Sequence, residues 1–200
     1  MQRLRELSRR VEAVYGEMAD TFSGYQRASG LTCRDSCGEC CTQTTIEATV
    51  LEALPLALHL FDQGKAEQTL TQLEELPEVS GCFFYQRLSF DGKQGHCTVY
   101  QQRPSICRMF GAAGYRDKQG QAALSVCKVI KADKLEKYQQ HLIMLTANPP
   151  PMMMSIKEQV SQLDYELGNK HYPINQAFKL ALEKVLLKAY YSSFDGEQIA

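Results

Sequence analysis

Apolar residues recur at alternating spacings of three and four along the first 25 residues. The positions that follow this pattern are Leu4, Leu7, Val11, Val14, Met18 and Tyr25. Such a stripe is typical of an amphipathic helix that buries one face. It also resembles a short coiled-coil seam, but a stripe of this length more often docks on its own domain. We therefore predict a helical N-terminal arm over residues 1–30.

Helices and turns alternate after this arm. Thr44 and Glu47 have the spacing of a capping box and predict a following helix, which Pro55 is expected to interrupt. Residues 66–76 predict a further helix. It ends at Pro77, because a proline cannot continue the helical hydrogen bonding.

Two segments carry the signals of β-hairpins. Residues 82–90 and 96–100 are rich in β-forming side chains, and Asp-Gly-Lys-Gln-Gly separates them. A weaker hairpin is expected over residues 113–126, with its turn at 117–120. Residues 128–146 then return to a helical pattern.

Three consecutive prolines mark the clearest linker, at residues 148–151, since a helix cannot run through them. Two helices are expected beyond it, over residues 155–167 and 174–191. We therefore divide the chain into the arm, a central domain over residues 31–147 and a C-terminal helical annex over residues 148–200.

Charge and hydropathy exclude several classes of protein. A net charge of −1 and a pI near 6.4 give no electrostatic footprint for nucleic acid. No window approaches the roughly 18 apolar residues of a membrane span, and the N-terminus lacks the apolar core of a secretory signal. We therefore expect a cytoplasmic protein that binds neither nucleic acid nor membranes.

The eight cysteines change this picture most. In a reducing compartment an even number of cysteines points to metal or redox chemistry rather than to disulfides. The members of a dense cluster are Cys33, Cys37, Cys40 and Cys41, and the more distant ones are Cys82, Cys97, Cys107 and Cys127. We predict that all eight are candidate metal ligands.

The spacing of the cluster favours iron over zinc. Cys33, Cys37 and Cys40 have the C-x3-C-x2-C spacing of a [4Fe-4S] tripod, whereas zinc sites more often use two separated C-x2-C pairs. Because neighbouring residues cannot easily aim both sulfurs at one ion, Cys40 and Cys41 are expected to serve two centres, or one of them to lie outside the ligand set. Eight sulfurs suit two four-cysteine sites, whether zinc or iron-sulfur.

The order of these motifs resembles a known family. The segment Cys37-Gly-Glu-Cys40-Cys41, then Cys97-Thr-Val-Tyr-x2-Arg-Pro-x2-Cys-Arg-x-Phe110, then Cys127, is similar to the bacterial CxxCxxCC cysteine-cluster proteins (YkgJ type). These are described as a zinc- or iron-chelating domain, and the resemblance covers about residues 33–129. It implies metal chelation. The usual C-x2-C at the start is C-x3-C here, so the role of Cys33 is open.

Two arginines flank Cys107 within this block. A four-thiolate site is negatively charged, and a guanidinium can donate to sulfur or to a carbonyl without deprotonating. Arg103 and Arg108 are therefore candidate cofactor-binding residues, although a surface or salt-bridge role fits them equally well. His96 is a weaker alternative ligand, because adjacent side chains of a strand point to opposite faces.

Together these features predict an α-rich α+β fold. Its cysteine-cluster core would hold a small antiparallel sheet and be wrapped by N- and C-terminal helices. The expected function is to bind a [4Fe-4S] cluster in a structural, redox or electron-transfer role. Zinc in a structural or chaperone role is an alternative, with a protein partner docked on the residue 4–18 stripe. A related cysteine pattern in lysine N-methylases leaves a methyltransferase-like enzyme open.

Overall fold

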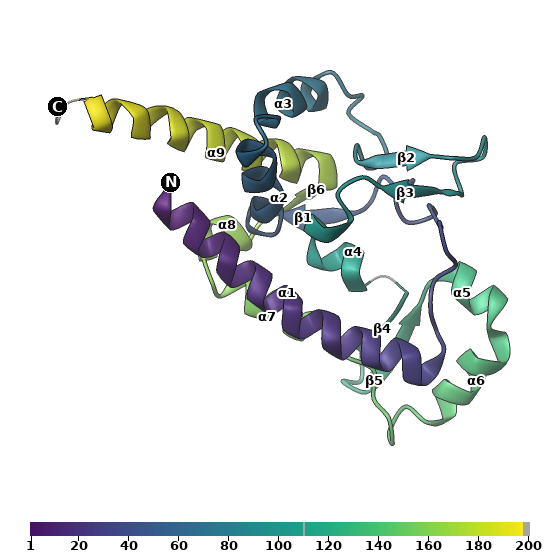
Figure 1. Cartoon of the computed structure of the whole chain (residues 1–200). Helices are drawn as coiled ribbons and strands as arrows, with labels where there is room; N and C mark the ends of the chain where they lie inside the picture. The colour runs from purple at the N-terminus through teal and green to yellow at the C-terminus, as the bar shows by residue number, and fades with distance from the viewer. Residues whose placement is uncertain (110, 198–200) are drawn as a thin grey trace.

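The computed structural model describes residues 1–109 and 111–197 (Figure 1). Helices dominate, and the strands of these residues form three two-stranded antiparallel sheets, which confirms the α-rich α+β class. The elements run in the order α1 (Gln2–Ser29), β1 (Glu47–Thr49), α2 (Val50–Asp62), α3 (Ala66–Glu74), β2 (Tyr85–Arg87), β3 (Gly95–Cys97), the 3-10 helix η1 (Tyr100–Gln102), α4 (Ser105–Met109), β4 (Ala112–Arg116), β5 (Ala122–Val126), α5 (Lys128–Asp133), α6 (Leu135–Ile143), α7 (Met153–Ser161), α8 (Tyr165–Gly168), β6 (His171–Pro173) and α9 (Ile174–Glu197).

The long helix α1 confirms the predicted N-terminal helix. Its apolar stripe is buried and includes two aromatic residues that the pattern did not single out, Tyr15 and Phe22. Gly30 ends the helix in the left-handed conformation, at φ 66°. The residue 4–18 stripe packs into the core, with Val11 fully buried, so the expectation that it offers a docking face for a partner is wrong.

The main core lies between α1, α2 and α9. α2 packs against both of the long helices, and α3 packs against α9 (Figure 1). The capping box that starts α2 is formed by Thr49 and Glu52, not by Thr44 and Glu47. The earlier pair was wrong because residues 47–49 form β1, whose pairing with β6 holds them extended.

Pro55 does not interrupt the second helix, contrary to expectation. It lies inside α2, which continues to Asp62. A proline there removes one helical hydrogen bond at a cost of about 3 kcal/mol. α2 is buried around most of its circumference, and the apolar surface removed from water offsets this cost.

The C-terminal segment returns to the start of the central domain through a strand pair. β1 and β6 pair with Ala48 opposite Tyr172, and the Ile174 amide donates to the Ile46 carbonyl at 2.9 Å. The first residues of α9 are therefore fixed beside the cysteine-rich part of the chain. This pairing was not predicted, because each strand has only three residues.

Both predicted hairpins are present. β2 pairs with β3, with Tyr85 opposite Cys97, and β4 pairs with β5 around a turn that follows Arg116. The first hairpin is shorter than expected, since Tyr100 begins η1. Phe110, which belongs to the family resemblance, lies outside the described residues.

Two predicted helices are each divided. Residues 128–146 form α5 and α6, separated at Lys134, whose φ of −134° is not helical. Residues 155–167 contain most of α7 and part of α8, and the side chain of Asp164 caps α8 by accepting from the Leu167 amide. The proline segment docks on β4 through a 2.7 Å hydrogen bond from the Gly114 amide to the Pro151 carbonyl.

A second, smaller core lies at the far end of α1. Its buried residues are Tyr25, Leu31, Ala112, Leu124 and Ile130. They come from α1, the segment just after it, the β4–β5 hairpin and α5. α1 therefore spans two cores, with Phe22 in the main one and Tyr25 in the other.

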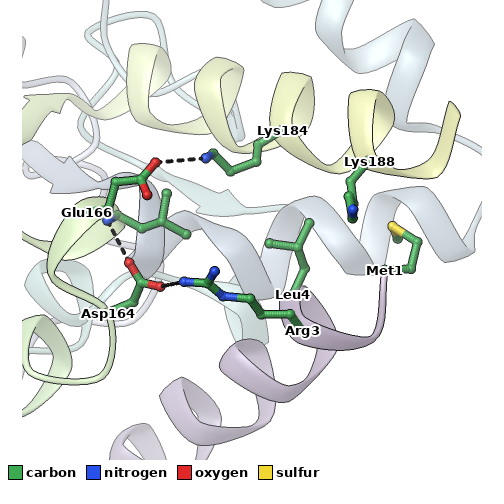
Figure 2. Close-up of a pocket in the computed structure, with 8 residues that line it drawn as sticks. Met1, Arg3, Leu4, Asp164, Glu166, Lys184 and Lys188 are labelled. Atoms are coloured by element: carbon green, nitrogen blue, oxygen red, sulfur yellow. Dashed lines mark hydrogen bonds and ion pairs between the residues drawn. The ribbon is translucent and has the colours of Figure 1, made fainter. Parts of the chain in front are cut away.

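Ion pairs close the opposite end of the molecule. Figure 2 shows Arg3 on α1 beside Asp164 at 2.7 Å, and Lys184 on α9 beside Glu166 at 3.4 Å. They line a cavity of about 260 Å³ that contains none of the cysteines. Among the described residues, no helix combines the length and the apolar character that crossing a membrane requires.

Candidate metal centre

Seven of the eight cysteines line one cavity of about 520 Å³. They come from the loop after α1, the segment before β2, the strand β3 and the short helix α4. These residues are Cys33, Cys37, Cys40, Cys41, Cys82, Cys97 and Cys107. Cys127 caps α5 outside the cavity lining. All eight side chains are free thiols, and only Cys33 is exposed.

The cysteine loop is held by backbone hydrogen bonds to the β2–β3 hairpin. The Gly38 amide donates to the Lys93 carbonyl at 2.8 Å, and the Gly95 amide donates to the Ser36 carbonyl at 2.9 Å. Cys37 thereby forms an antiparallel bridge with Gln94. The loop acts as a short third strand beside β3, which brings cysteines distant in sequence together.

Tyr85 packs beneath this loop. Its hydroxyl donates to the Gly92 carbonyl at 2.7 Å. A Cβ atom on Gly38 would lie 1.6 Å from the Tyr85 hydroxyl oxygen, and a Cβ atom on Gly95 would lie 2.3 Å from the Gln86 carbonyl oxygen. Both positions therefore require glycine, since the loop and the hairpin approach too closely for any side chain.

Cys82 is fixed from two sides. Its amide donates to the Cys41 carbonyl at 2.8 Å. Asn175, on α9, accepts from the Phe83 amide at 2.9 Å and donates to the Gly81 carbonyl at 2.8 Å. The start of α9 thus clamps the residues on both sides of Cys82.

Two backbone amides act on sulfurs of the cavity. The Phe84 amide lowers the pKa of Cys82 and the Val99 amide lowers the pKa of Cys97, in both cases against the larger effect of burial. Amides near a sulfur favour its thiolate form and tune a bound metal.

The position of Cys107 in α4 depends on a buried network of hydrogen bonds between α1, α2 and α4. The Glu52 carboxylate is 4% exposed and accepts from the Thr49 amide at 2.8 Å and from the hydroxyl of Ser105, which is fully buried. The Tyr15 hydroxyl donates to the Glu52 carbonyl at 3.3 Å and accepts from the Ser105 amide at 3.2 Å. α1 and α2 together position α4.

Four thiols influence one another, and three of them, Cys82, Cys97 and Cys107, pack against the main core. A charge on Cys40 raises the pKa values of Cys82, Cys97 and Cys107. Charges on Cys82 and Cys97 also raise the pKa of Cys107. Burial raises the pKa of Cys82 to about 12 and raises the pKa values of Cys97 and Cys107. A hydrogen bond with Cys41, together with burial, raises the pKa of Cys40. Neutral thiols are therefore favoured until a cation compensates the charge.

Cys33 has a different set of charged neighbours. Burial raises its pKa to about 11, and the nearby charges of Cys37, Cys40 and Cys127 act in the same direction. The ammonium of Lys134 opposes them. Cys127 therefore lies near Cys33, although it does not line the cavity.

Arg103 and Arg108 both line the cavity, in different ways. The charge of Arg103 lowers the pKa values of Cys40, Cys97 and Cys107, against the larger effect of burial at the last two. Its guanidinium lies 3.4 Å from the ring centre of Tyr100. Arg108 donates to the Arg103 carbonyl at 2.8 Å. Arg103 faces the thiols, whereas Arg108 braces the turn that carries it.

The donor chemistry of this cavity fits a metal centre. Thiolates prefer zinc and iron-sulfur clusters. Within residues 1–109 and 111–197, however, no three Cys, His, Asp or Glu side chains converge closely enough to hold a single ion. The sulfurs surround a space instead of meeting at a point. His96 lines the same cavity on the strand of Cys97.

Several residues of the site had no signal in the sequence. Asn175 lies 93 residues beyond Cys82 in numbering, and only the β1–β6 pairing brings it there. Nothing in the sequence distinguishes Tyr15 and Glu52 from the other residues of their helices. The Gly38 spacing between two cysteines was visible, but its contact with Tyr85 depends on the hairpin register.

One comparison with known protein families finds a match. Residues 32–128 match a family model named CxxCxxCC and described as "Putative zinc- or iron-chelating domain". The match contains all eight cysteines and both arginines. No curated protein and no solved structure matches the chain significantly. Over residues 32–128, the chain is therefore similar to the CxxCxxCC domain family.

Proposed function

We propose that this protein holds a [4Fe-4S] cluster through Cys40, Cys82, Cys97 and Cys107. One observation carries the proposal: these four thiols line one cavity together with Arg103, and the charges of the other three thiols and of Arg103 act on Cys107. Four cysteines are the usual ligands of such a cluster. Arg103 would offset the negative charge of the centre, and Arg108 would hold the turn that positions Arg103.

The spread of the sulfurs supports a cluster over a single ion. A zinc ion needs four ligands at about 2.3 Å, so its sulfurs must almost touch. A cubic cluster is wider and keeps its cysteine sulfurs further apart. A cavity of about 520 Å³ has room for the wider group.

When bound, such a cluster supplies one-electron redox chemistry or a rigid cross-link. The protein's part is to bury the sulfurs, to place the Phe84 and Val99 amides where they favour two of the thiolates, and to place one cation nearby. We therefore infer a structural or electron-transfer role in a reducing, cytoplasmic setting.

Zinc is the second candidate, because the matching family is described as zinc- or iron-chelating. A four-cysteine zinc site would be structural or would serve a metal chaperone. It would require the cavity to contract around the ion. The same residues would be its ligands.

Anaerobic purification, followed by elemental analysis, sulfide assay and an absorption spectrum, separates the two candidates. Iron with equimolar acid-labile sulfide and a broad visible band supports the cluster. Stoichiometric zinc without colour contradicts it and supports the alternative. Cys107→Ser should abolish the iron signal while circular dichroism reports whether the helices persist. Calorimetry with S-adenosylmethionine on the loaded protein tests the methyltransferase alternative in the same preparation.

A further inference from the structure

We propose that Phe90, at the tip of the β2–β3 hairpin, anchors this protein in an apolar, acid-rimmed pocket of a partner protein. The hairpin tip comprises residues 87–93, which lead from one strand toward the other. This inference goes beyond the proposed function, because the tip contains no cysteine and does not depend on a bound metal. It follows from the exposure, the fixed conformation and the charge of these residues.

Phe90 is exposed, whereas the aromatic residues at the base of the hairpin are not. Among the described residues, no large apolar side chain is more exposed than Phe90, and Leu88 on the same tip is 62% exposed. Phe83 and Phe84 pack against the main core instead. Phe90 therefore adds no buried surface to the fold, and its burial by a partner would favour association.

Hydrogen bonds fix the turn that carries Phe90. The Ser89 hydroxyl donates to the Asp91 carboxylate at 2.7 Å and accepts from the Gln94 amide at 3.0 Å. The Asp91 carboxylate also accepts from the Lys93 amide at 3.0 Å. These bonds close the turn without using the side chain of Phe90. A preformed turn loses little conformational freedom when a partner binds it, so more of the burial energy remains as affinity.

Two further contacts join the tip to the rest of the molecule. The Tyr85 hydroxyl donates to the Gly92 carbonyl at 2.7 Å, and the Gly38 amide donates to the Lys93 carbonyl at 2.8 Å. Figure 1 shows the connection between β2 and β3 at the edge of the molecule, away from the long helices α1 and α9. A partner bound to Phe90 would therefore lie beside the cysteine loop.

The tip is positively charged. Residues 87–93 contain two cations, Arg87 and Lys93, and one anion, Asp91. Asp91 lies 3.9 Å from the Lys93 ammonium and is engaged with its own turn. Arg87 lies over the turn, since a Cβ atom on Gly92 would be 3.6 Å from its Nε atom, and no carboxylate of the described residues pairs with it. Acidic groups around the partner's pocket would complement this charge.

The position of Asp91 favours a protein over a membrane as the partner. Asp91 directly follows Phe90, and the turn holds its carboxylate at the tip. Insertion of Phe90 into a bilayer would bring this carboxylate to the lipid headgroups, where anionic lipids repel it. A protein pocket can instead receive the ring and place its acids beside Arg87, away from Asp91.

The charges at the cavity of Figure 2 argue against a second copy of the chain as the occupant. This cavity has an apolar lining, but its cations outnumber its acids. The charged residues that line it are Arg3, Lys184, Lys188, Asp164 and Glu166. It would repel Arg87 and Lys93 of another copy. The occupant that the tip fits is therefore a different protein.

The test begins with photo-crosslinking of the full chain in the cells that naturally contain it. A benzophenone-bearing amino acid replaces Leu88, so that Phe90 is kept. In a matched strain it replaces Tyr165 on α8, which is 78% exposed. The protein that crosslinks at position 88 and not at position 165 is purified and titrated with the unlabelled wild type by calorimetry. Capture alone does not support the proposal, because support requires the variant effects on the measured affinity.

Phe90→Ser should weaken binding by at least about 30-fold, the loss typical of a central anchor. Arg87→Glu should weaken it by a smaller factor and make it less dependent on salt. Ser89→Ala loosens the turn without changing its charge and should also cause a smaller loss. Tyr165→Ser is the matched control and should bind like the wild type. All four variants should keep the unfolding free energy and the metal content of the wild type.

The inference is overturned if no protein crosslinks at position 88 above the level at position 165, or if Phe90→Ser binds as tightly as the wild type. Binding to vesicles of phosphatidylcholine and phosphatidylglycerol that is lost in Phe90→Ser would assign the tip to a membrane and also overturn it. So would a dimer in analytical ultracentrifugation that Phe90→Ser abolishes. A protein that docks through Phe90 but holds no metal contradicts only the proposed function, so the two failures are distinct.

Discussion

The hydroxyl of Tyr85 fills the space in which Gly38 would carry a side chain. A Cβ atom at Gly38 would lie 1.6 Å from the hydroxyl oxygen and 2.2 Å from the ring carbon that bears it. This contact presses the cysteine loop onto the β2–β3 hairpin between Cys37 and Cys40. The distance between the loop cysteines and the hairpin cysteines therefore depends on the absence of one methyl group.

Gly38→Ala should accordingly weaken metal binding. The loop must move away from Tyr85 or the ring must leave its place, and overpacking of this kind typically costs about 1–3 kcal/mol. We expect a lower free energy of unfolding and substoichiometric metal, measured by urea denaturation and elemental analysis.

Gly16→Ala is the matched control. Gly16 lies on the exposed side of α1, and an added Cβ atom meets nothing within 4 Å. Alanine in a helix interior is favoured over glycine by about 0.5–1 kcal/mol. This variant should be more stable and fully loaded; equal behaviour of the two variants would contradict the role given to Tyr85.

Asn175→Ala should loosen the segment that contains Cys82. The change leaves the Phe83 amide and the Gly81 carbonyl without their partner, at a cost of about 1–3 kcal/mol. Metal should dissociate faster into a chelator. Asn169→Ala, at an exposed position of the same C-terminal segment, should leave the rate unchanged. Similar rates in both variants would exclude Asn175 as a clamp.

Arg103→Gln should reduce metal affinity without unfolding the chain. The variant removes the cation that acts on Cys40, Cys97 and Cys107, and residues that support metal ligands typically contribute about 10–100-fold in affinity. If the metal is an iron-sulfur cluster, its reduction potential should fall, because the added electron loses a nearby positive charge. Arg10→Gln, exposed on α1, serves as the control in competition titrations and voltammetry.

The stability of the metal-free protein should decline in mild alkali. Burial raises the pKa of Cys82 to about 12, whereas an unfolded cysteine has a pKa of about 8.5. A raised folded-state pKa contributes stability that is present below the unfolded value and is lost as the pH rises toward the folded value. Urea denaturation of reduced, chelated protein should show this loss above about pH 8.5.

Cys82→Ala isolates this thiol from the other groups that titrate in alkali. Its unfolding free energy should depend less steeply on pH than that of the wild type over the same range. Parallel pH profiles of the two proteins would show that the Cys82 thiol is not buried in the folded chain. Metal affinity should change in the opposite sense and weaken as the pH falls, because protons compete for the sulfurs.

Local patterns predicted the helices and hairpins well where one strong signal dominated. The stripe of α1 and the turns of both hairpins needed no information from elsewhere in the chain. The capping box was misplaced because residues 47–49 pair with a strand more than 120 residues away in numbering. Pro55 was misread because the burial of α2 depends on α1 and α9.

In the candidate site, too, some features were predictable from local sequence and others depend on distant parts of the chain. Its thiol-rich character was visible, since the cysteine spacing alone predicts a cluster of thiols. Its supports were not: Asn175 and Ser105 are common polar residues whose importance comes from the elements that they contact. Which thiols neighbour which also depends on the loop, the hairpin register and the position of α5.

The spacing of Phe22 and Tyr25 along α1 fixes how the two cores are oriented relative to each other. Phe22 points into one and Tyr25 into the other, and the cysteine loop begins soon after Gly30. One residue inserted between these aromatic residues would turn everything beyond it by about 100°. The loop would then leave the hairpin even though every cysteine and every spacing between cysteines was unchanged. The arrangement of the eight cysteines thus depends on a helix that contains none of them.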